Sequence, residues 1–286
     1  MMIDAGGPGG VKTGFLGPAG TWSEEALMTN TTLTADDTVP FASITEVIAA
    51  VASGSVAQGI VPMENAIEGS VTATLDMLAF EVEDVSITRE IDHPISLKLI
   101  ARQPLELDQI EKVISLPHAY AQCRHYLREK LPGAEVVAAN STAEAVRIVS
   151  LSDEKWAAIG SGLAARSYGC AVLDDEIEDY PGNQTRFVIL SKTPASQDLD
   201  LPYKTSIVCT IAHDQPGSLL QILQEFAHRY VNLTKIESRP SKKGLGDYIF
   251  FIDVEGKKDD PQIGAAIKCL ECKLARVKLL GSYPVG

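Results

Sequence analysis

The sequence predicts an α/β fold in two domains, and three observations support this. Short apolar runs alternate with amphipathic segments from Gly14 to Ser191, a pattern typical of an α/β domain with a largely parallel sheet. Residues 191–203 hold two prolines and two aspartates and few apolar side chains, as expected of a linker. The rest of the chain fits the order βαββαβ, which is the ferredoxin-like arrangement.

The first domain is expected to follow a polar, Gly-rich tail, residues 1–13. Its apolar runs predict strands at 14–17, 59–61, 96–101, 112–117, 134–139, 156–161 and 185–191. Helical spacing of apolar side chains predicts helices at 22–30, 45–54, 72–80, 119–131 and 142–151. The expected boundaries are 1–13 for the tail, 14–192 for the first domain, 193–203 for the linker and 204–286 for the second domain.

The second domain is expected to place two helices on a four-stranded sheet. The predicted strands are 205–212, 232–238, 247–256 and 275–281, with helices at 216–230 and 261–274. The first helix shows an apolar stripe at three- and four-residue spacing, made of Leu219, Leu220, Leu223, Phe226, Ala227 and Tyr230. In the third strand, apolar side chains two apart share one face, namely Tyr248, Phe250, Ile252 and Val254. So small a domain leaves a sheet face or edge to cover, so we expect it to pair with another subunit.

Composition limits the possible partners. A chain of 286 residues with 45% hydrophobic content can bury one large or two moderate cores. No apolar stretch reaches the roughly 20 residues of a membrane-spanning helix, and the N-terminus lacks a basic start and an apolar signal core, so we expect a cytoplasmic protein. The net charge of −13 argues against nucleic acid or an anionic membrane, because both select a basic face.

The cysteines and histidines do not suggest a metal site. Five cysteines form no disulfide framework, and the pair Cys269 and Cys272 lies in an expected helix with no second pair beside it. The histidines at 93, 118, 125, 213 and 228 have no metal-ligand spacing. Motifs of the common hydrolases and of nucleotide-binding proteins are also missing from the sequence.

Four loop segments join an apolar strand to a helix start or strand, where free N–H groups can hold an anion. In segment 17–24 (GPAGTWSE), Thr21 and Glu24 fit a capping box, and the segment can equally be a simple helix start. Segment 62–70 places Glu64 and Asn65 at the carboxyl end of a strand, the edge where open α/β sheets bind ligands; a turn-forming role for Asn65 is the alternative.

The other two segments combine hydroxyls with amide or cationic groups. Segment 140–144 (NSTAE) is a second capping box, whose free N–H groups can also contact a substrate. Segment 183–187 (NQTRF) sets a hydroxyl and a guanidinium beside a buried strand, which suits a reaction centre for a carboxylate substrate.

Taken together, these segments resemble the prephenate dehydratase family from about Gly14 to the C-terminus. The resemblance lies in GPAGTWSE (17–24), PMENAIEGSV (62–71), and Tyr168-Gly169 with IEDYPGNQTRF (177–187). The Thr-Arg-Phe triplet after an Asn and before a strand is the most specific of these. The second domain resembles a regulatory ACT domain in DQPGSLL (214–220) and ESRP (237–240). Two departures are Ala66 after the Glu-Asn pair, where the family usually has Ser, and Ser115-Leu116-Pro117-His118 where Ser-His-Pro-Gln is frequent.

The resemblance implies a two-lobed catalytic domain like the type II periplasmic binding proteins, with the active site in its cleft. It implies prephenate as substrate, L-phenylalanine as allosteric effector at an ACT interface, a homodimer or homotetramer, and no metal or organic cofactor. It also implies a monofunctional enzyme, because no helical segment of a fused chorismate mutase precedes Gly14.

The resemblance further implies roles for particular residues. Thr185 would help the ring hydroxyl leave, in a relay with Glu64 or a water, and Asn65 would orient the substrate. Arg186 would pair with a substrate carboxylate or brace the loop through Glu178 or Asp179, and Phe187 completes the catalytic group. The implied substrate-binding residues are Thr21, Ser23, Ser70, Ser141, Thr142 and Asn183. The implied phenylalanine-binding residues are Asp214, Gly217, Ser218, Leu219, Leu220, Asn232, Leu233, Thr234, Glu237, Ser238, Arg239 and Pro240.

Two alternatives stay open from the sequence. An arogenate dehydratase would act on the amino-acid analogue of prephenate, and no residue separates the two substrates. A non-catalytic amino-acid sensor would use the same two domains without chemistry, although it has no evident need for the Thr185 hydroxyl.

Overall fold

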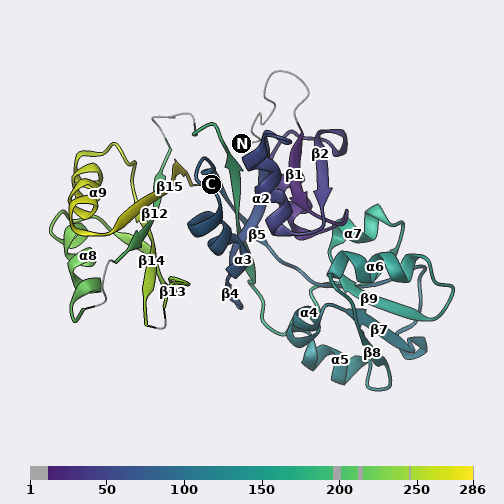
Figure 1. Ribbon diagram of the computed structural model, residues 1–286. Coiled ribbons are helices and arrows are strands. Elements are labelled where there is room, and N and C mark those ends of the chain that lie inside the picture. Colours follow the sequence, from purple (N-terminus) through teal and green to yellow (C-terminus); the bar gives the residue numbers. More distant parts are fainter. Residues whose placement is uncertain (1–11, 196–200, 212–214, 245, 286) are drawn as a thin grey trace. The chain divides into compact units, whose positions relative to one another are not determined.

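The structure is a computed structural model that describes residues 12–195, 201–211, 215–244 and 246–285 (Figure 1). Its contacts form two compact units. The first unit holds the chain up to Val47 together with 59–71 and 92–187, and the second holds 48–58, 72–91 and 188 onward. No helix in the described ranges is both long and apolar enough to cross a membrane.

The first sheet has six strands in the order β2-β1-β3-β11-β5, with β4 paired to β3. Its strands are β1 (Thr13–Leu16), β2 (Thr38–Phe41), β3 (Gln58–Asn65), β4 (Gly69–Ser70), β5 (Ser86–Pro94) and β11 (Gln184–Ser191). Strands β1 and β2 are parallel, whereas the short strand β4 returns antiparallel to β3. The helices between these strands are α1 (Trp22–Asn30), α2 (Ile44–Ser53) and α3 (Thr72–Asp76), which continues as a π-helical turn, Met77–Glu81.

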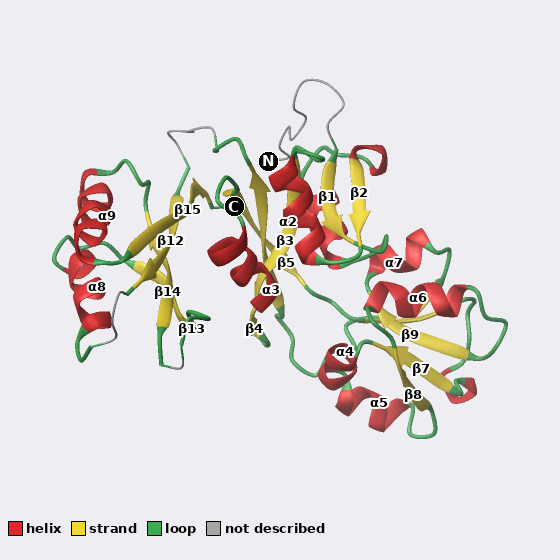
Figure 2. Ribbon diagram, in the orientation of Figure 1, coloured by secondary structure: helices red, strands yellow, loops and turns green. Residues whose placement is uncertain are grey.

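The second sheet has five strands in the order β10-β6-β9-β7-β8 and lies between two helical layers (Figure 2). The strands are β6 (Lys98–Ala101), β7 (Lys112–Ser115), β8 (Glu135–Ala138), β9 (Trp156–Gly160) and β10 (Ala171–Asp174). On β9, Ala157 and Ile159 pack into a core with α4 (Pro117–Gln122) and α5 (Arg124–Lys130). Ala158, between them, packs into the opposite core with α6 (Thr142–Ser150) and α7 (Gly162–Ser167). The strand alternation thus produces an α/β/α sandwich.

The single helix expected at 119–131 is wrong, because the chain breaks at Cys123 into α4 and α5. Cys123 is fully buried with a non-helical backbone. The break exposes the first N–H groups of α5, and the Asp179 carboxylate accepts hydrogen bonds from the N–H of His125 at 3.0 Å and of Tyr126 at 3.3 Å. A carboxylate at a helix N-terminus satisfies donors that lack intrahelical partners.

Several elements were not expected from the sequence, namely β2, β4, β5, β10 and α7. Strand β5 carries Arg89, Glu90, Asp92 and His93 and so lacks an apolar pattern. Glu90 is nevertheless 1% exposed, because the Lys204 ammonium donates to both of its oxygens at 2.6 and 2.7 Å. A buried carboxylate is tolerated when it is paired in this way.

The second unit contains a four-stranded antiparallel sheet in the order β13-β14-β12-β15. Its strands are β12 (Tyr203–Thr210), β13 (Leu233–Pro240), β14 (Tyr248–Glu255) and β15 (Arg276–Pro284), and helices α8 (Ser218–Ala227) and α9 (Pro261–Lys273) complete the βαββαβ order. The predicted apolar face of the third strand is confirmed in part, because Phe250, Ile252 and Val254 lie in the core beneath the helices, whereas Tyr248 is 43% exposed.

The predicted apolar stripe of α8 is wrong in part, because Phe226 is buried in the core as predicted but the two leucines at the start of the helix are exposed. Leu219 and Leu220 are exposed and Tyr230 is 98% exposed, whereas Ile222, Glu225 and Phe226 are buried. The helix can bury Glu225 because its carboxylate contacts Arg229, one turn further on, and Lys273 of α9. The buried face of α8 therefore includes Ile222, Glu225 and Phe226 rather than the two leucines.

The face of this sheet opposite the helices also contains buried side chains. Ile249, Phe251 and Asp253 of β14 are each at most 2% exposed. The β15 ammonium of Lys278 donates to the carbonyl of Val82, and Arg239 of β13 contacts Asp76 in α3 at 3.1 Å. Residues 72–83 therefore contact this sheet within the same unit.

Candidate active site

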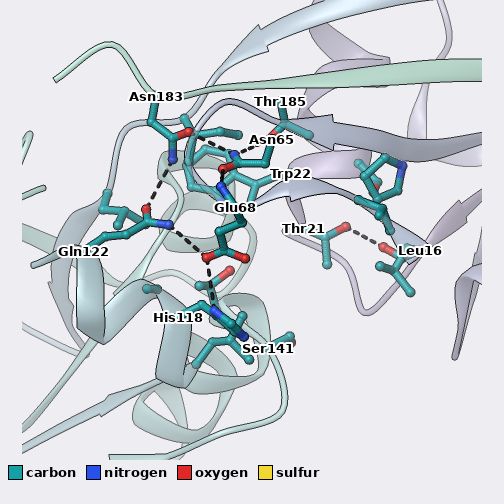
Figure 3. A pocket seen from close by; sticks show the side chains of 18 of the residues that line it. Leu16, Thr21, Trp22, Asn65, Glu68, His118, Gln122, Ser141, Asn183 and Thr185 are labelled. Atoms are coloured by element: carbon teal, nitrogen blue, oxygen red, sulfur yellow. Dashed lines mark hydrogen bonds and ion pairs between the residues drawn. The ribbon is translucent and has the colours of Figure 1, made fainter. Parts of the chain in front are cut away.

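A cavity of about 310 Å³ lies in the first unit and collects all four loop segments (Figure 3). Its lining is mainly apolar, with hydroxyl and amide groups placed among the apolar side chains. Among the described residues that line it, the ionisable side chains are Glu68 and His118. Of the residues expected to bind or transform a substrate, it holds Thr21, Ser23, Asn65, Ser141, Thr142, Asn183, Thr185 and Phe187.

Segment 17–24 enters the cavity where α1 begins. Gly20 has φ +87° and its backbone lies against Ala164, so a side chain there would clash. The Ser161 hydroxyl donates to the Gly20 carbonyl at 2.9 Å. These contacts fix the turn before α1.

The capping box expected at Thr21 and Glu24 is wrong. The Thr21 hydroxyl donates to the Leu16 carbonyl at 2.6 Å, so it does not cap the helix. The Glu24 carboxylate instead accepts from the Gly20 N–H at 2.6 Å. Thr21 and Ser23 both line the cavity and are 7% and 3% exposed.

The expected capping box at Ser141 is confirmed. The Ser141 hydroxyl accepts from the Glu144 N–H at 3.0 Å, and the Glu144 carboxylate accepts from the Asn140 N–H at 3.0 Å. Asn140, Ser141 and Thr142 line the cavity, which therefore receives the first residues of both α1 and α6. Helix N-termini carry partial positive charge and N–H groups that suit an anion.

Asn65 connects the two segments that contain the expected catalytic residues. Its Nδ2 donates to Thr185 Oγ1 and to Asn183 Oδ1, each at 2.9 Å. Its Oδ1 accepts from the N–H groups of Ile67 and Glu68, each at 3.0 Å. Asn65 therefore forms the predicted turn and also contacts Thr185, a residue 120 positions away.

Glu64, Arg186 and Ser70 do not line the cavity. Successive side chains of a strand point to opposite faces, so Thr185 and Phe187 face the cavity while Arg186 lies between them on the other side. There its guanidinium is 3.7 Å from the Glu64 carboxylate. Asp179 and Glu178 were the alternative partners expected for Arg186. The Asp179 carboxylate caps α5, and the Glu178 carboxylate accepts from the Leu97 N–H.

Four polar residues of the cavity were not among the expected site residues, namely Glu68, His118, Gln122 and Asn140. Glu68 Oε1 accepts from Gln122 Nε2 at 3.0 Å and lies 3.2 Å from His118 Nδ1. Glu68 belongs to one of the quoted motifs, but its partners are 50 and 54 positions further along the chain. The sequence signal that could have identified them is His118, which lies at the last position of a run where the family frequently has Gln.

The expected effector residues lie at two places in the second unit. Gly217 has φ +93° and precedes α8, which begins with Ser218, Leu219 and Leu220. Asn232 precedes β13, and β13 contains Leu233, Thr234, Glu237, Ser238, Arg239 and Pro240. Strand β13 is an edge of its sheet. Asp214 lies outside the described residues.

No group of three or more His, Cys, Asp or Glu side chains in the described ranges is arranged to hold a metal ion. Burial raises the pKa of the Cys123 thiol above its ordinary value and that of Cys209 to about 12. A thiol with so high a pKa stays protonated at neutral pH and is a poor nucleophile or ligand.

Comparison with known proteins identifies the family of the chain. The prephenate dehydratase family model matches residues 13–195, and the ACT domain model matches 205–271. A prephenate dehydratase of Methanocaldococcus jannaschii is 46% identical over 228 residues, which is 79% of this chain and 81% of that protein. A prephenate dehydratase of Bacillus subtilis is 38% identical over 282 residues, 96% of this chain and 98% of that protein.

A solved structure shows the same fold over nearly the whole chain. Prephenate dehydratase from Arthrobacter aurescens in complex with L-Phe has a TM-score of 0.87 and 37% identity, and the match covers 96% of this chain and 90% of that one. The fold is therefore the two-lobed α/β catalytic domain followed by a ferredoxin-like ACT domain. The chain belongs to the prephenate dehydratase family.

Proposed function

We propose that this protein is a prephenate dehydratase, which converts prephenate to phenylpyruvate, water and carbon dioxide and is regulated by L-phenylalanine. One observation supports the chemistry most directly. In a chain of this family, the Thr185 hydroxyl faces a largely apolar cavity and is held at 2.9 Å by Asn65.

The reaction needs help mainly for its leaving group. The ring carboxylate leaves as carbon dioxide, its bonding electron pair enters the ring, and the C–O bond to the ring hydroxyl breaks. The departing oxygen must receive a proton or a strong hydrogen bond, a contribution of roughly 10² to 10⁴ in rate. Thr185 is proposed as the donor.

The described residues of the cavity lining include no Lys or Arg, so an anionic substrate must be held by other groups. The N-termini of α1 and α6 provide N–H groups, and Thr21, Ser23, Ser141 and Thr142 provide hydroxyls at the same ends. Asn183 is proposed to add an amide contact. These donors act in a mainly apolar surrounding, where hydrogen bonds to charge are stronger than in water.

Arg186, Glu64 and Ser70 are proposed to act behind the cavity wall. The Arg186 guanidinium is 11% exposed and lies 3.7 Å from the Glu64 carboxylate, and Ser70 on β4 is the register partner of Glu64 on β3. The three residues therefore join β3, β4 and β11 around Asn65 and Thr185. A relay through Glu64 itself would need its carboxylate to reach the cavity face, so a water is the better relay partner.

Regulation is proposed to occur at the ACT domain, through L-phenylalanine bound by segments 214–220 and 232–240 of two chains. Strand β13 is a free sheet edge within the described part of this chain, and an exposed edge favours pairing. A homodimer or homotetramer follows from such pairing. The proposed boundaries are 14–192 for the catalytic domain and 204–286 for the ACT domain, and a cytoplasmic location is part of the same proposal.

The first experiment is an assay of the purified protein for phenylpyruvate release from prephenate and phenylalanine release from arogenate, each with and without added phenylalanine. Turnover of prephenate that changes with phenylalanine is the expected result. Preference for arogenate would change only the substrate. No turnover of either compound would make the sensor reading the better one.

A further inference from the structure

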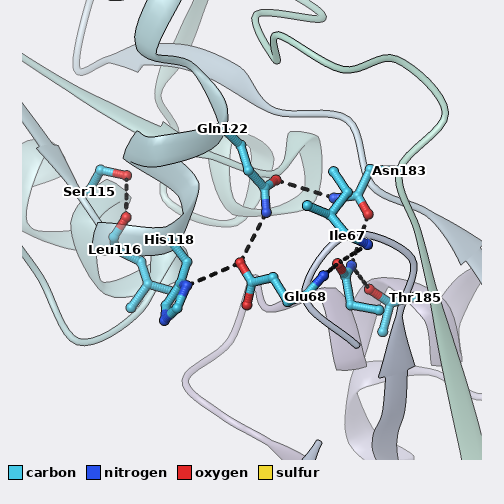
Figure 4. A network of polar contacts seen from close by, with 9 residues as sticks. Ile67, Glu68, Ser115, Leu116, His118, Gln122, Asn183 and Thr185 are labelled. Carbon is cyan, nitrogen blue, oxygen red and sulfur yellow. Dashed lines mark hydrogen bonds and ion pairs between the residues drawn. The ribbon is translucent and has the colours of Figure 1, made fainter. Parts of the chain in front are cut away.

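Four side chains of the cavity and one backbone N–H group form a closed ring of hydrogen bonds (Figure 4), in which each member donates to the next. Asn65 Nδ2 donates to Asn183 Oδ1 at 2.9 Å, and Asn183 Nδ2 donates to Gln122 Oε1 at 3.2 Å. Gln122 Nε2 donates to Glu68 Oε1 at 3.0 Å. The backbone N–H of Glu68 closes the ring by donating to Asn65 Oδ1 at 3.0 Å.

Asn65 and the Glu68 carboxylate each have one possible hydrogen-bonding role in this ring. Their roles therefore fix the orientation of the three amides. Asn65 must present Oδ1 to the backbone because two N–H groups, those of Ile67 and Glu68, donate to it. An ionised Glu68 carboxylate can only accept, so Gln122 must turn its NH₂ towards it. Asn183 lies between the two and can satisfy both neighbours in one orientation only.

The ring determines how the Thr185 hydroxyl bonds. The Asn65 NH₂ group has two hydrogens, and its two shortest contacts are Asn183 Oδ1 and Thr185 Oγ1, each at 2.9 Å. Among the described residues this is the one hydrogen bond that the Thr185 hydroxyl makes, and it is the acceptor. Its own proton is therefore left to donate into the cavity, where the leaving oxygen would lie.

We infer that Glu68 is a positioning residue for the reaction: its carboxylate, acting as the terminal acceptor of this ring, fixes the amides of Gln122, Asn183 and Asn65 so that Thr185 is kept as a donor. The inference rests on the proposed function. It also explains how a carboxylate can line a cavity proposed to bind an anion, because Gln122 Nε2 donates to Glu68 Oε1 and His118 Nδ1 lies 3.2 Å from the same oxygen.

The rest of the ring is held firmly enough to transmit this effect. Gln122 is the last residue of α4, and its carbonyl accepts from the Asp179 N–H at 2.6 Å. Asn183 is 4% exposed, and its carbonyl accepts from the Ile95 N–H at 2.9 Å. With these backbones fixed, loss of the Glu68 acceptor frees the Gln122 amide to turn over. Asn183 can then turn as well, and two NH₂ groups would face each other at Asn65.

The test compares Glu68→Ala with Glu68→Gln. Glutamine keeps an oxygen that can accept from Gln122, whereas alanine removes the acceptor. We expect Glu68→Ala to lower kcat for prephenate at least about tenfold with KM within about threefold, since small losses of orientation reduce rates strongly. Glu68→Gln should retain most of the activity. Glu135→Ala, which removes an exposed carboxylate in the same unit, serves as the control for lost charge.

A second measurement does not depend on turnover. In ¹⁵N NMR spectra, the side-chain NH₂ signals of Asn65, Asn183 and Gln122 should be well dispersed in the wild type and in Glu68→Gln. In Glu68→Ala those of Asn183 and Gln122 should collapse towards free-amide positions.

Normal kcat in Glu68→Ala, equal losses in both variants, or unchanged NH₂ signals would each overturn the inference. A wild-type protein that turns over neither prephenate nor arogenate would overturn the proposed function instead, and the NMR comparison would still decide whether Glu68 orders the ring.

Discussion

At the scale of single residues, the decisive feature is the alternation along β11. Thr185 and Phe187 face the cavity, whereas Arg186 points to the opposite side and approaches Glu64. The pattern Asn-Gln-Thr-Arg-Phe therefore places the proposed proton donor on the cavity face and Arg186 on the opposite face, next to Glu64. Changing the register of this strand by one residue would exchange the two roles.

Thr185→Val should lower kcat for prephenate at least about a hundredfold, because valine has nearly the same shape but no proton to donate. Thr185→Ser retains the hydroxyl and should keep kcat within about tenfold of the wild type. Steady-state kinetics with circular dichroism as the check on folding would measure both. Near-normal activity in Thr185→Val would remove this residue from the mechanism.

Residues that act within one short motif could be predicted from the sequence, and residues that act through distant partners could not. Thr185, Asn65 and Ser141 could be selected because each sits in a recognisable loop segment, and all three line the cavity. The ring through Glu68 and Gln122 joins positions that lie 54 residues apart. Such a contact depends on tertiary packing, which no local pattern encodes.

At the scale of elements, buried charge is what the hydrophobic pattern failed to predict. The orientation of α8 was predicted from its leucines, yet the helix buries Glu225 and exposes Leu219 and Leu220. Strand β5 was missed for the same reason, since Glu90 is buried against Lys204. Apolar periodicity alone cannot identify a face whose polar side chains are paired.

Glu225→Gln should destabilise the second unit in a pH-dependent way. Hydrogen bonds from Lys273 and Arg229 lower the pKa of the Glu225 carboxyl below its ordinary value. A lowered folded-state pKa stabilises the protein above the unfolded pKa, and this stabilisation disappears as the pH falls through the folded pKa.

The expected loss in Glu225→Gln is about 1.5–3 kcal/mol near pH 7, as for a hydrogen bond to a charged group. Denaturant unfolding at pH 7 and at pH values below 4 measures it, and the difference from the wild type should shrink towards the acid side. Glu135→Gln, on an exposed pair with Lys112, is the control. A difference that does not change with pH would assign the effect to packing.

At the scale of the whole molecule, contacts within the second unit connect the segment ESRP, proposed to bind the effector, to helix α3. Arg239 of the ESRP motif contacts Asp76 at 3.1 Å and the Thr72 hydroxyl at 3.3 Å, and Lys242 contacts Asp76 at 2.9 Å. Asp76 and Thr72 are the two ends of α3. Val71, immediately before α3, lines the cavity. A change at β13 that moves Arg239 would therefore act on the helix that begins at the cavity wall.

Asp76→Asn should weaken the effect of phenylalanine while leaving catalysis in its absence within about threefold of the wild type. Allosteric coupling is a free-energy difference between states, typically about 1–3 kcal/mol, and the charged contacts at Asp76 are candidates to carry part of it. Prephenate turnover across a phenylalanine titration should change by less than about half the wild-type factor, whether phenylalanine activates or inhibits.

Glu83→Gln breaks a different contact of the same unit, with Arg276, and should leave the response unchanged. Calorimetry shows whether phenylalanine still binds: a variant that binds it and responds like the wild type would exclude Asp76 from the coupling, since an effector acts only through its different affinity for the two states.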